Sequence, residues 1–165
     1  MRYAGPLYRA INPVYARDPL SGEEARRFGG RFNARGTPAL YTSLSPHTAL
    51  RESSQMGTLQ PTVLVGYEAD LEPVLDATSA DAPEGRGASL DLLSAPTWRD
   101  EMSGGRSART QTFAADLVAD GFAGLLVRSF ARGASPADLN LVLFRWTDRA
   151  PARLVVVDDE GRLSR

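Results

Sequence analysis

Short apolar runs recur along the chain, and each is bounded by glycine, proline or polar residues, a pattern typical of β-strands. Two segments predict helices. The first has Ser45 as N-cap and Pro46 at its first position and runs to about Gln55, and the second covers 111–119 and stops at Asp120-Gly121. Because strands outnumber helices without regular alternation, the order predicts a compact α+β domain with mixed or antiparallel sheets and short helices. The expected strands cover 7–10, 39–42, 62–69, 124–129, 139–146 and 154–157.

The length of 165 residues fits a single domain over 1–165, and 42% hydrophobic with 24% charged residues is ordinary globular composition. The most irregular stretch is 77–110, a long excursion expected to hold one or two short helices, at 89–95 and 97–103. No signal sequence and no run of about 18 apolar residues is present, so we expect a cytoplasmic protein that does not enter a membrane.

The composition removes several kinds of chemistry. The chain has no cysteine and a single histidine, which excludes disulfides, a cysteine nucleophile and a histidine metal cluster, and no metal site is expected. His47 is expected at the surface. All 19 basic residues are arginine, so any phosphate held by a cation must be held by a guanidinium. A net charge of −1 gives no general attraction to nucleic acid.

A glycine-rich segment offers the first candidate site. Gly29 and Gly30 precede Arg31, and paired glycines allow a tight turn and a close approach to a ligand. Arg31 would then lie at a pocket rim, and Asn33 would fix the loop by side-chain to backbone bonds. The alternative is a plain turn with a solvated arginine.

Two further candidates lie near this segment. Tyr41, at the end of an expected strand, is either an aromatic platform for a planar ring or a core tyrosine. Glu52 shares a helix face with Ala49 and Met56, which predicts partial burial, whereas the alternative is an ion pair with Arg51 or another arginine.

Ser129, at the end of the expected strand over 124–129, is well placed to hydrogen-bond a ligand, and Asn140 begins the next apolar strand. Polar residues at strand ends are also common in any sheet.

Together these residues resemble the RES-domain proteins, named for an arginine, a glutamate and a serine. The resemblance covers about 7–146, and 77–110 carries no motif. The matching residues are Tyr8-Arg9, Gly30-Arg31-Phe32-Asn33, Gly36, Ala39-Leu40-Tyr41, Ala49, Glu52, Ser129 and the strand 140–144.

The resemblance implies a fold similar to ADP-ribosyltransferase toxins of the diphtheria-toxin type, with NAD as the consumed substrate. It implies that Arg31, Tyr41 and Glu52 are catalytic. Arg31 and Tyr41 would also bind NAD, together with the remaining pocket residues Ser129, Arg9 and Asn33. Such proteins are toxins paired with an antitoxin that carries an Xre-like helix-turn-helix, expected here to cover the NAD pocket.

Three functions follow as alternatives. The first is a mono-ADP-ribosyltransferase that modifies a protein, such as ribose-phosphate pyrophosphokinase, and arrests growth. The second is a toxin that degrades NAD by passing ADP-ribose to water or phosphate. The third is a non-catalytic interaction module.

Overall fold

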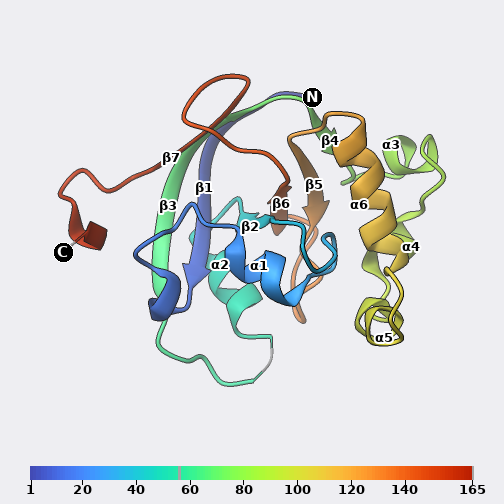
Figure 1. Cartoon of the computed structure of the whole chain (residues 1–165), viewed down its shortest axis with the longest axis horizontal. Helices are drawn as coiled ribbons and strands as arrows, with labels where there is room; N and C mark the ends of the chain where they lie inside the picture. The colour runs from blue at the N-terminus through green and yellow to red at the C-terminus, as the bar shows by residue number, and fades with distance from the viewer. Residues whose placement is uncertain (56, 165) are drawn as a thin grey trace.

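A strongly curled, seven-stranded mixed sheet organises the computed structural model, which describes residues 1–55 and 57–164 (Figure 1). The strand order is β4-β5-β6-β2-β1-β3-β7, and all neighbours are antiparallel except the parallel pair β4 and β5. The strands are β1 (Tyr3–Ile11), β2 (Leu40–Ser43), β3 (Val63–Leu71), β4 (Val74–Asp76), β5 (Gly124–Arg128), β6 (Leu139–Leu143) and β7 (Ala152–Val156).

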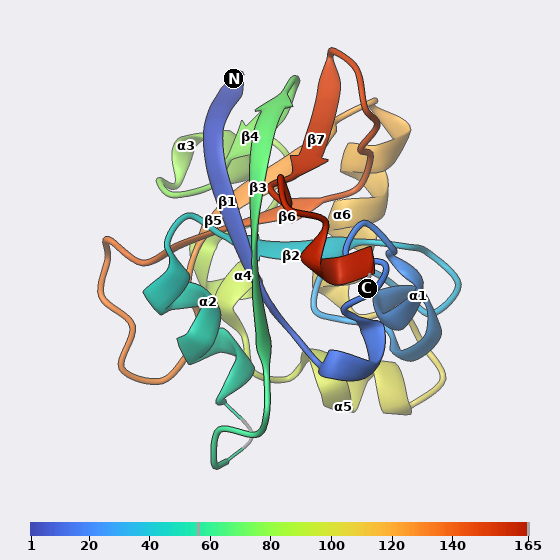
Figure 2. The ribbon, with the colours of Figure 1, turned by 90° about the vertical axis from the view of Figure 1, so that its left-hand side faces the viewer.

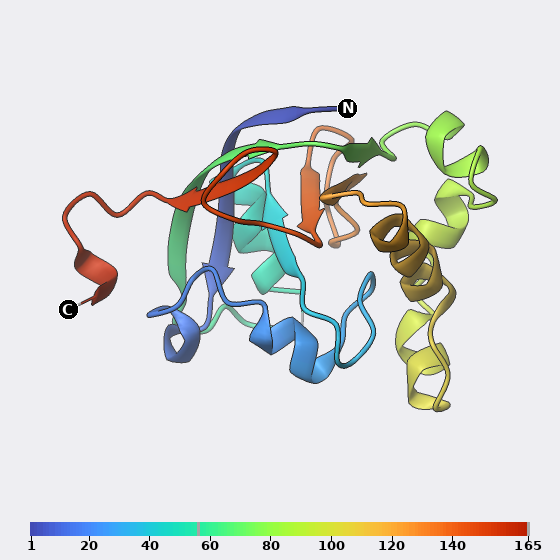
Figure 3. The same cartoon turned by 45° about the horizontal axis from the view of Figure 1, so that its top comes forward.

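The helices are short and gather in two places. Figure 3 shows α3 to α6 together on one side of the molecule, where α4 and α5 pack on α6. Helix α2 packs on β1, β2 and β3. In the described ranges no helix is long and apolar enough to cross a membrane. The bounds are α1 (Glu23–Phe28), α2 (Pro46–Ser53), α3 (Asp81–Glu84), α4 (Leu90–Ser94), α5 (Trp98–Ser103) and α6 (Arg109–Ala119), with 3₁₀-helices at Pro13–Tyr15 and Arg162–Ser164.

The sheet bends sharply at β1. Strands β1 and β2 pair only at Tyr8 and Ser43, and Figure 2 shows β1, β3 and β7 running across β2, β6 and β5. The bend also brings the start of β1 to β4, where the Met1 amino group donates to the Val74 carbonyl at 2.7 Å and the Val74 amide donates back at 2.8 Å. Two parts of the sheet therefore face each other around one core.

The three strands β2, β6 and β5 are buried on both faces. Along β6, Leu141 and Leu143 point into the core against β1 and β3, whereas Val142 points into a second core against α6 and α4. The same alternation places Leu126 in the first core and Leu125 in the second. This double burial explains the near-continuous apolar runs of β5 and β6.

The predicted α+β class is confirmed, as are all six predicted strands and both predicted helices within a few residues of their expected ends. The sequence reading missed β4 and the helices α1 and α3. In the excursion 77–110, the two short helices expected at 89–95 and 97–103 are confirmed as α4 and α5, and only the four-residue α3 was not expected. Strand β1 begins before Pro6 rather than after it, because β1 has no partner strand on its other side at this position.

Replacing Leu141 with alanine is expected to lower the free energy of unfolding by about 3 kcal/mol, because a fully buried leucine would leave a cavity between two packed layers. Leu64→Ala, at a side chain that is 43% exposed, serves as the control and is expected to change stability by less than about 1 kcal/mol. Urea denaturation measures both variants, and equal losses would contradict the assignment of the core.

Candidate active site

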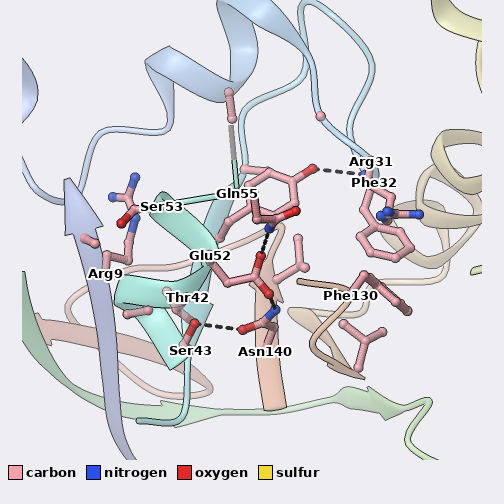
Figure 4. Close-up of a pocket in the computed structure, with 18 of the residues that line it drawn as sticks. Arg9, Arg31, Phe32, Thr42, Ser43, Glu52, Ser53, Gln55, Phe130 and Asn140 are labelled. Carbon is pink, nitrogen blue, oxygen red and sulfur yellow. Dashed lines mark hydrogen bonds between the residues drawn. The ribbon is translucent and has the colours of Figure 1, made fainter. Parts of the chain in front are cut away.

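A cavity of about 470 Å³ opens between β2, helix α2, the loop 29–32 and the first residues of α5 (Figure 4). Its volume lies in the range of small-molecule sites, roughly 300–1,000 Å³. Of the six predicted site residues, four line it, and they are Arg9, Arg31, Tyr41 and Glu52. The bend of the sheet and the docking of α2 thus bring together residues spread over 43 positions of the chain, from 9 to 52.

The Glu52 carboxylate is held by three hydrogen-bond donors. The Ser129 hydroxyl donates to Oε1. The Asn140 amide also donates to Oε1, and the Gln55 amide donates to Oε2 (Figure 4). Three donors on a partly buried carboxylate fix its orientation. Glu52 is therefore presented to the cavity as a fixed anion.

Asn140 is itself oriented by a residue of β2. The Ser43 hydroxyl donates to Asn140 Oδ1 at 2.7 Å, which leaves the amide nitrogen to face Glu52. The two residues are opposite each other in the register of β2 and β6. In the sequence, Asn140 was among the matching residues, but no function was assigned to it. Ser43 and Gln55 were not identified, because no local sequence pattern distinguishes them.

Helix α2 is anchored by Asp138, which precedes β6. Its carboxylate accepts bonds from the Thr48 hydroxyl, the Ser135 amide and Arg51, each at 2.7 Å. These contacts, the Thr48 bond first, hold the pKa of Asp138 well below its usual value. Arg51 thus pairs with Asp138 rather than with Glu52.

His47 is exposed one turn before Arg51, as predicted, and its ring nitrogen lies 3.3 Å from that guanidinium.

The loop that carries Arg31 is fixed by Tyr41 and Asn33. The Tyr41 hydroxyl accepts from the Phe32 amide at 3.0 Å and donates to Asn33 Oδ1 at 2.6 Å. Burial raises the pKa of Tyr41, so its hydroxyl remains a donor. The Asn33 amide nitrogen donates to the carbonyls of Ala25 and Thr37, both at 2.8 Å. Asn33 therefore has the loop-fixing contacts expected of it and does not line the cavity.

Helix α6 holds the same loop from the other side. The Gln111 amide nitrogen donates to the Gly30 and Asn33 carbonyls at 2.8 and 3.1 Å, and the Thr110 hydroxyl donates to the Arg31 carbonyl. A Cβ at Gly30 would lie 2.4 Å from the Tyr41 hydroxyl, so only glycine fits there. Sequence reasoning missed Thr110 and Gln111, which are both buried.

The Arg31 guanidinium is held by backbone and aromatic contacts. Its Nη1 donates to the Leu93 and Ala95 carbonyls at 3.2 and 2.7 Å, and its Cζ lies 4.5 Å from the centre of the Phe130 ring. Burial and, to a smaller degree, the charge of Arg99 lower the pKa of Arg31. An arginine still stays protonated near neutral pH, so a fixed cation faces the cavity.

Two other predicted residues have protein partners. Arg9 lines the cavity, and its Nη1 donates to the Pro19 carbonyl at 3.1 Å. Ser129 does not line the cavity; its hydroxyl lies behind Glu52, donates to that carboxylate and accepts from the Ala131 amide at 3.2 Å. Met56, expected on the helix face of Glu52, lies outside the described residues.

Comparisons with known proteins agree with the resemblance. The model of the RES domain family matches residues 6–165. Among solved structures, a chain of the M. tuberculosis MbcT–MbcA toxin–antitoxin complex is similar, with a TM-score of 0.69 and 26% sequence identity over 96% of this chain and 84% of that chain. Comparison with curated protein sequences gives no match. In the part of the chain that the structure describes, no group of three or more acidic or histidine side chains is arranged to hold a metal ion.

Tyr41→Phe is expected to lower the free energy of unfolding by about 1–3 kcal/mol, because the Phe32 amide loses its acceptor inside the loop. Urea denaturation measures the loss. The control is Tyr15→Phe, whose hydroxyl has no hydrogen-bond partner among the described residues, and its stability is expected to stay within about 0.5 kcal/mol of the wild type. A similar small effect at Tyr41 would contradict its role in fixing the loop.

Stability is expected to depend on pH through Asp138. Because its pKa is lowered in the folded state, its stabilisation is complete above the unfolded value of about 4 and is lost as the pH falls below it. The stability difference between wild type and Asp138→Asn is therefore expected to be largest near neutral pH and to narrow between about pH 4 and pH 2. Urea denaturation over this range measures it, and a constant difference would contradict the assignment.

Proposed function

Since the chain belongs to the RES domain family, we propose that it is the toxin of a toxin–antitoxin pair that cleaves the nicotinamide–ribose bond of NAD. We further propose that it transfers the ADP-ribose to a protein acceptor in the cytoplasm and so arrests growth. The similar structure, a chain of a toxin–antitoxin complex, supports the first part of this proposal. A nucleotide-biosynthesis enzyme such as ribose-phosphate pyrophosphokinase is the acceptor class we propose.

The observation that carries the proposal is a carboxylate fixed on the cavity wall by donors on both of its oxygens. Cleavage of the nicotinamide–ribose bond passes through a transition state with oxocarbenium character. The Glu52 carboxylate is prepared to stabilise that positive charge or to orient the attacking group. In NAD the nicotinamide ring is a cationic pyridinium, and it departs as neutral nicotinamide. Its departure therefore requires no proton, and the site needs no general acid.

The cations of the cavity suit the other half of the substrate. Figure 4 shows Arg31 and Arg9 on opposite sides of Glu52. NAD carries a diphosphate between its two ribose groups, and a guanidinium can hold such a group through two parallel hydrogen bonds. We assign this contact to Arg31. The Tyr41 ring lines the cavity and is assigned to contact the nicotinamide.

The partner that we propose is an antitoxin with an Xre-like helix-turn-helix. The similar structure was solved with an antitoxin, which supports a partner of this kind. We propose that the antitoxin covers the cavity, because blocking access of NAD to Glu52 would be sufficient to inhibit the toxin.

Glu52→Gln is expected to lower NAD turnover about a thousandfold, or about 4 kcal/mol of barrier, because it removes the negative charge and keeps the side-chain volume. The affinity for NAD is expected to change by less than about fivefold. Glu72→Gln, an exposed site outside the cavity, is the matched control and should turn over NAD normally. Turnover within tenfold of the wild type in Glu52→Gln would leave the non-catalytic interaction module as the better interpretation.

NAD labelled on its adenylate portion identifies the acceptor. The purified chain is incubated with this NAD, with and without cell lysate, beside Glu52→Gln. A labelled protein band that depends on Glu52 is the result expected for protein ADP-ribosylation. Free ADP-ribose or its phosphate, without a band, would contradict protein transfer and establish NAD degradation instead.

A further inference from the structure

The excursion 77–110, which carried no motif, contributes to the cavity. Trp98 and Arg99, the first two residues of α5, both line it. The carbonyls of Leu93 and Ala95, just before α5, hold the Arg31 guanidinium. This segment therefore builds part of the cavity wall.

Two guanidinium groups share the ring of Trp98. The Cζ of Arg99 lies 4.4 Å from the ring centre and the Cζ of Arg31 lies 5.9 Å from it. Trp98 is buried, with 8% of its surface exposed, so it is a fixed support, whereas Arg99 is exposed to solvent. Stacking on an aromatic face orients a guanidinium and leaves its N–H groups in the ring plane free to donate.

Neither cation forms an ion pair or a hydrogen bond with an acidic side chain among the described residues, and Glu52 acts on Arg31 only through its charge. Arg99 forms no ion pair and no hydrogen bond with the described residues, and Arg31 uses only Nη1, for the two carbonyls, which leaves Nε and Nη2 as donors. By contrast, Arg109, at the end of the same excursion, is paired with Glu101 at 2.8 Å. Burial first, and the charge of Arg99 second, lower the pKa of Arg31, so the two guanidinium groups repel each other across the Trp98 ring. A ligand anion would remove this repulsion.

We propose that Arg31 and Arg99, supported by Trp98, form a two-armed site for the diphosphate of a nucleotide. The inference rests on the proposed function and extends it, because it assigns a substrate-binding role to the excursion. Two guanidinium forks provide enough donors for the oxygens of two adjacent phosphates, whereas Arg31 alone has part of its fork occupied by the Leu93 and Ala95 carbonyls. A diphosphate bound here leaves the Glu52 side of the cavity for the ribose and the nicotinamide.

The test compares binding of ADP and AMP, by calorimetry at fixed ionic strength, to the wild type and three variants. Arg99→Ala is expected to weaken ADP binding about tenfold, or about 1.4 kcal/mol, and to remove most of the preference for ADP over AMP. Arg99→Lys keeps the positive charge but lacks the planar guanidinium, and its affinity for ADP is expected to fall about threefold. Arg106→Ala, an exposed arginine of the same excursion that does not line the cavity, should bind ADP like the wild type.

Kinetics with NAD separate this inference from the proposed function. Arg99→Ala is expected to raise KM for NAD about tenfold and to keep kcat within twofold, because the contact is made in substrate and transition state alike. Unchanged ADP binding and unchanged KM in Arg99→Ala would overturn the two-armed site while leaving the NAD enzyme intact. A third outcome is also informative: Arg99→Ala weakens ADP binding, but the wild type consumes no NAD. That outcome would support the diphosphate site and reject the proposed function.

Discussion

Strand β2 fixes the two charged groups of the cavity relative to each other. Tyr41 and Ser43 are two residues apart, so their side chains leave the same face of the strand. The Tyr41 hydroxyl holds the loop of Arg31, and the Ser43 hydroxyl orients the Asn140 amide that binds Glu52. The distance between the cation and the anion is therefore set by a buried strand of four residues.

Two hydrogen-bond networks extend from this strand into different parts of the chain. One passes through Asn140 and Glu52 to Ser129, and it requires that β5 and β6 pair and that α2 is docked. The other passes through the loop 29–33 to Gln111 on α6. The groups of both networks are largely removed from water, where an unpaired polar group is costly. Each network is thus both a part of the fold and a support of the cavity.

The sequence predicted the strands and helices that are marked by a pattern within their own residues. Apolar runs located β5 and β6, and the Ser45-Pro46 pair located the start of α2. The strand β4 has three residues and the helix α3 has four, and segments this short contain no full period of either pattern. The bend at β1 was also not predictable, because it depends on which strands pair and not on the composition of any one strand.

The site was predictable in its residues and less so in their contacts. The motif selected Arg31, Tyr41 and Glu52, and all three line the cavity. Ser129 was predicted to contact a ligand, and the contact that the sequence did not predict is its bond to Glu52, which joins residues 77 positions apart in the chain. Asn140 shows the same limit, because its link to Glu52 spans 88 positions. Contacts between distant segments depend on strand pairing and docking, which a linear pattern does not contain.

The absence of lysine has a structural consequence at the cavity. A compact ammonium needs hydration or several oxygen partners, whereas a planar guanidinium can stack on an aromatic ring and still donate from its edge. Arg31 does this over Phe130 while its Nη1 is held by two backbone carbonyls. A lysine at this position could satisfy the carbonyls but would keep a single donor, without the planar fork that two parallel hydrogen bonds to a phosphate need. The cavity therefore depends on arginine chemistry and not only on positive charge.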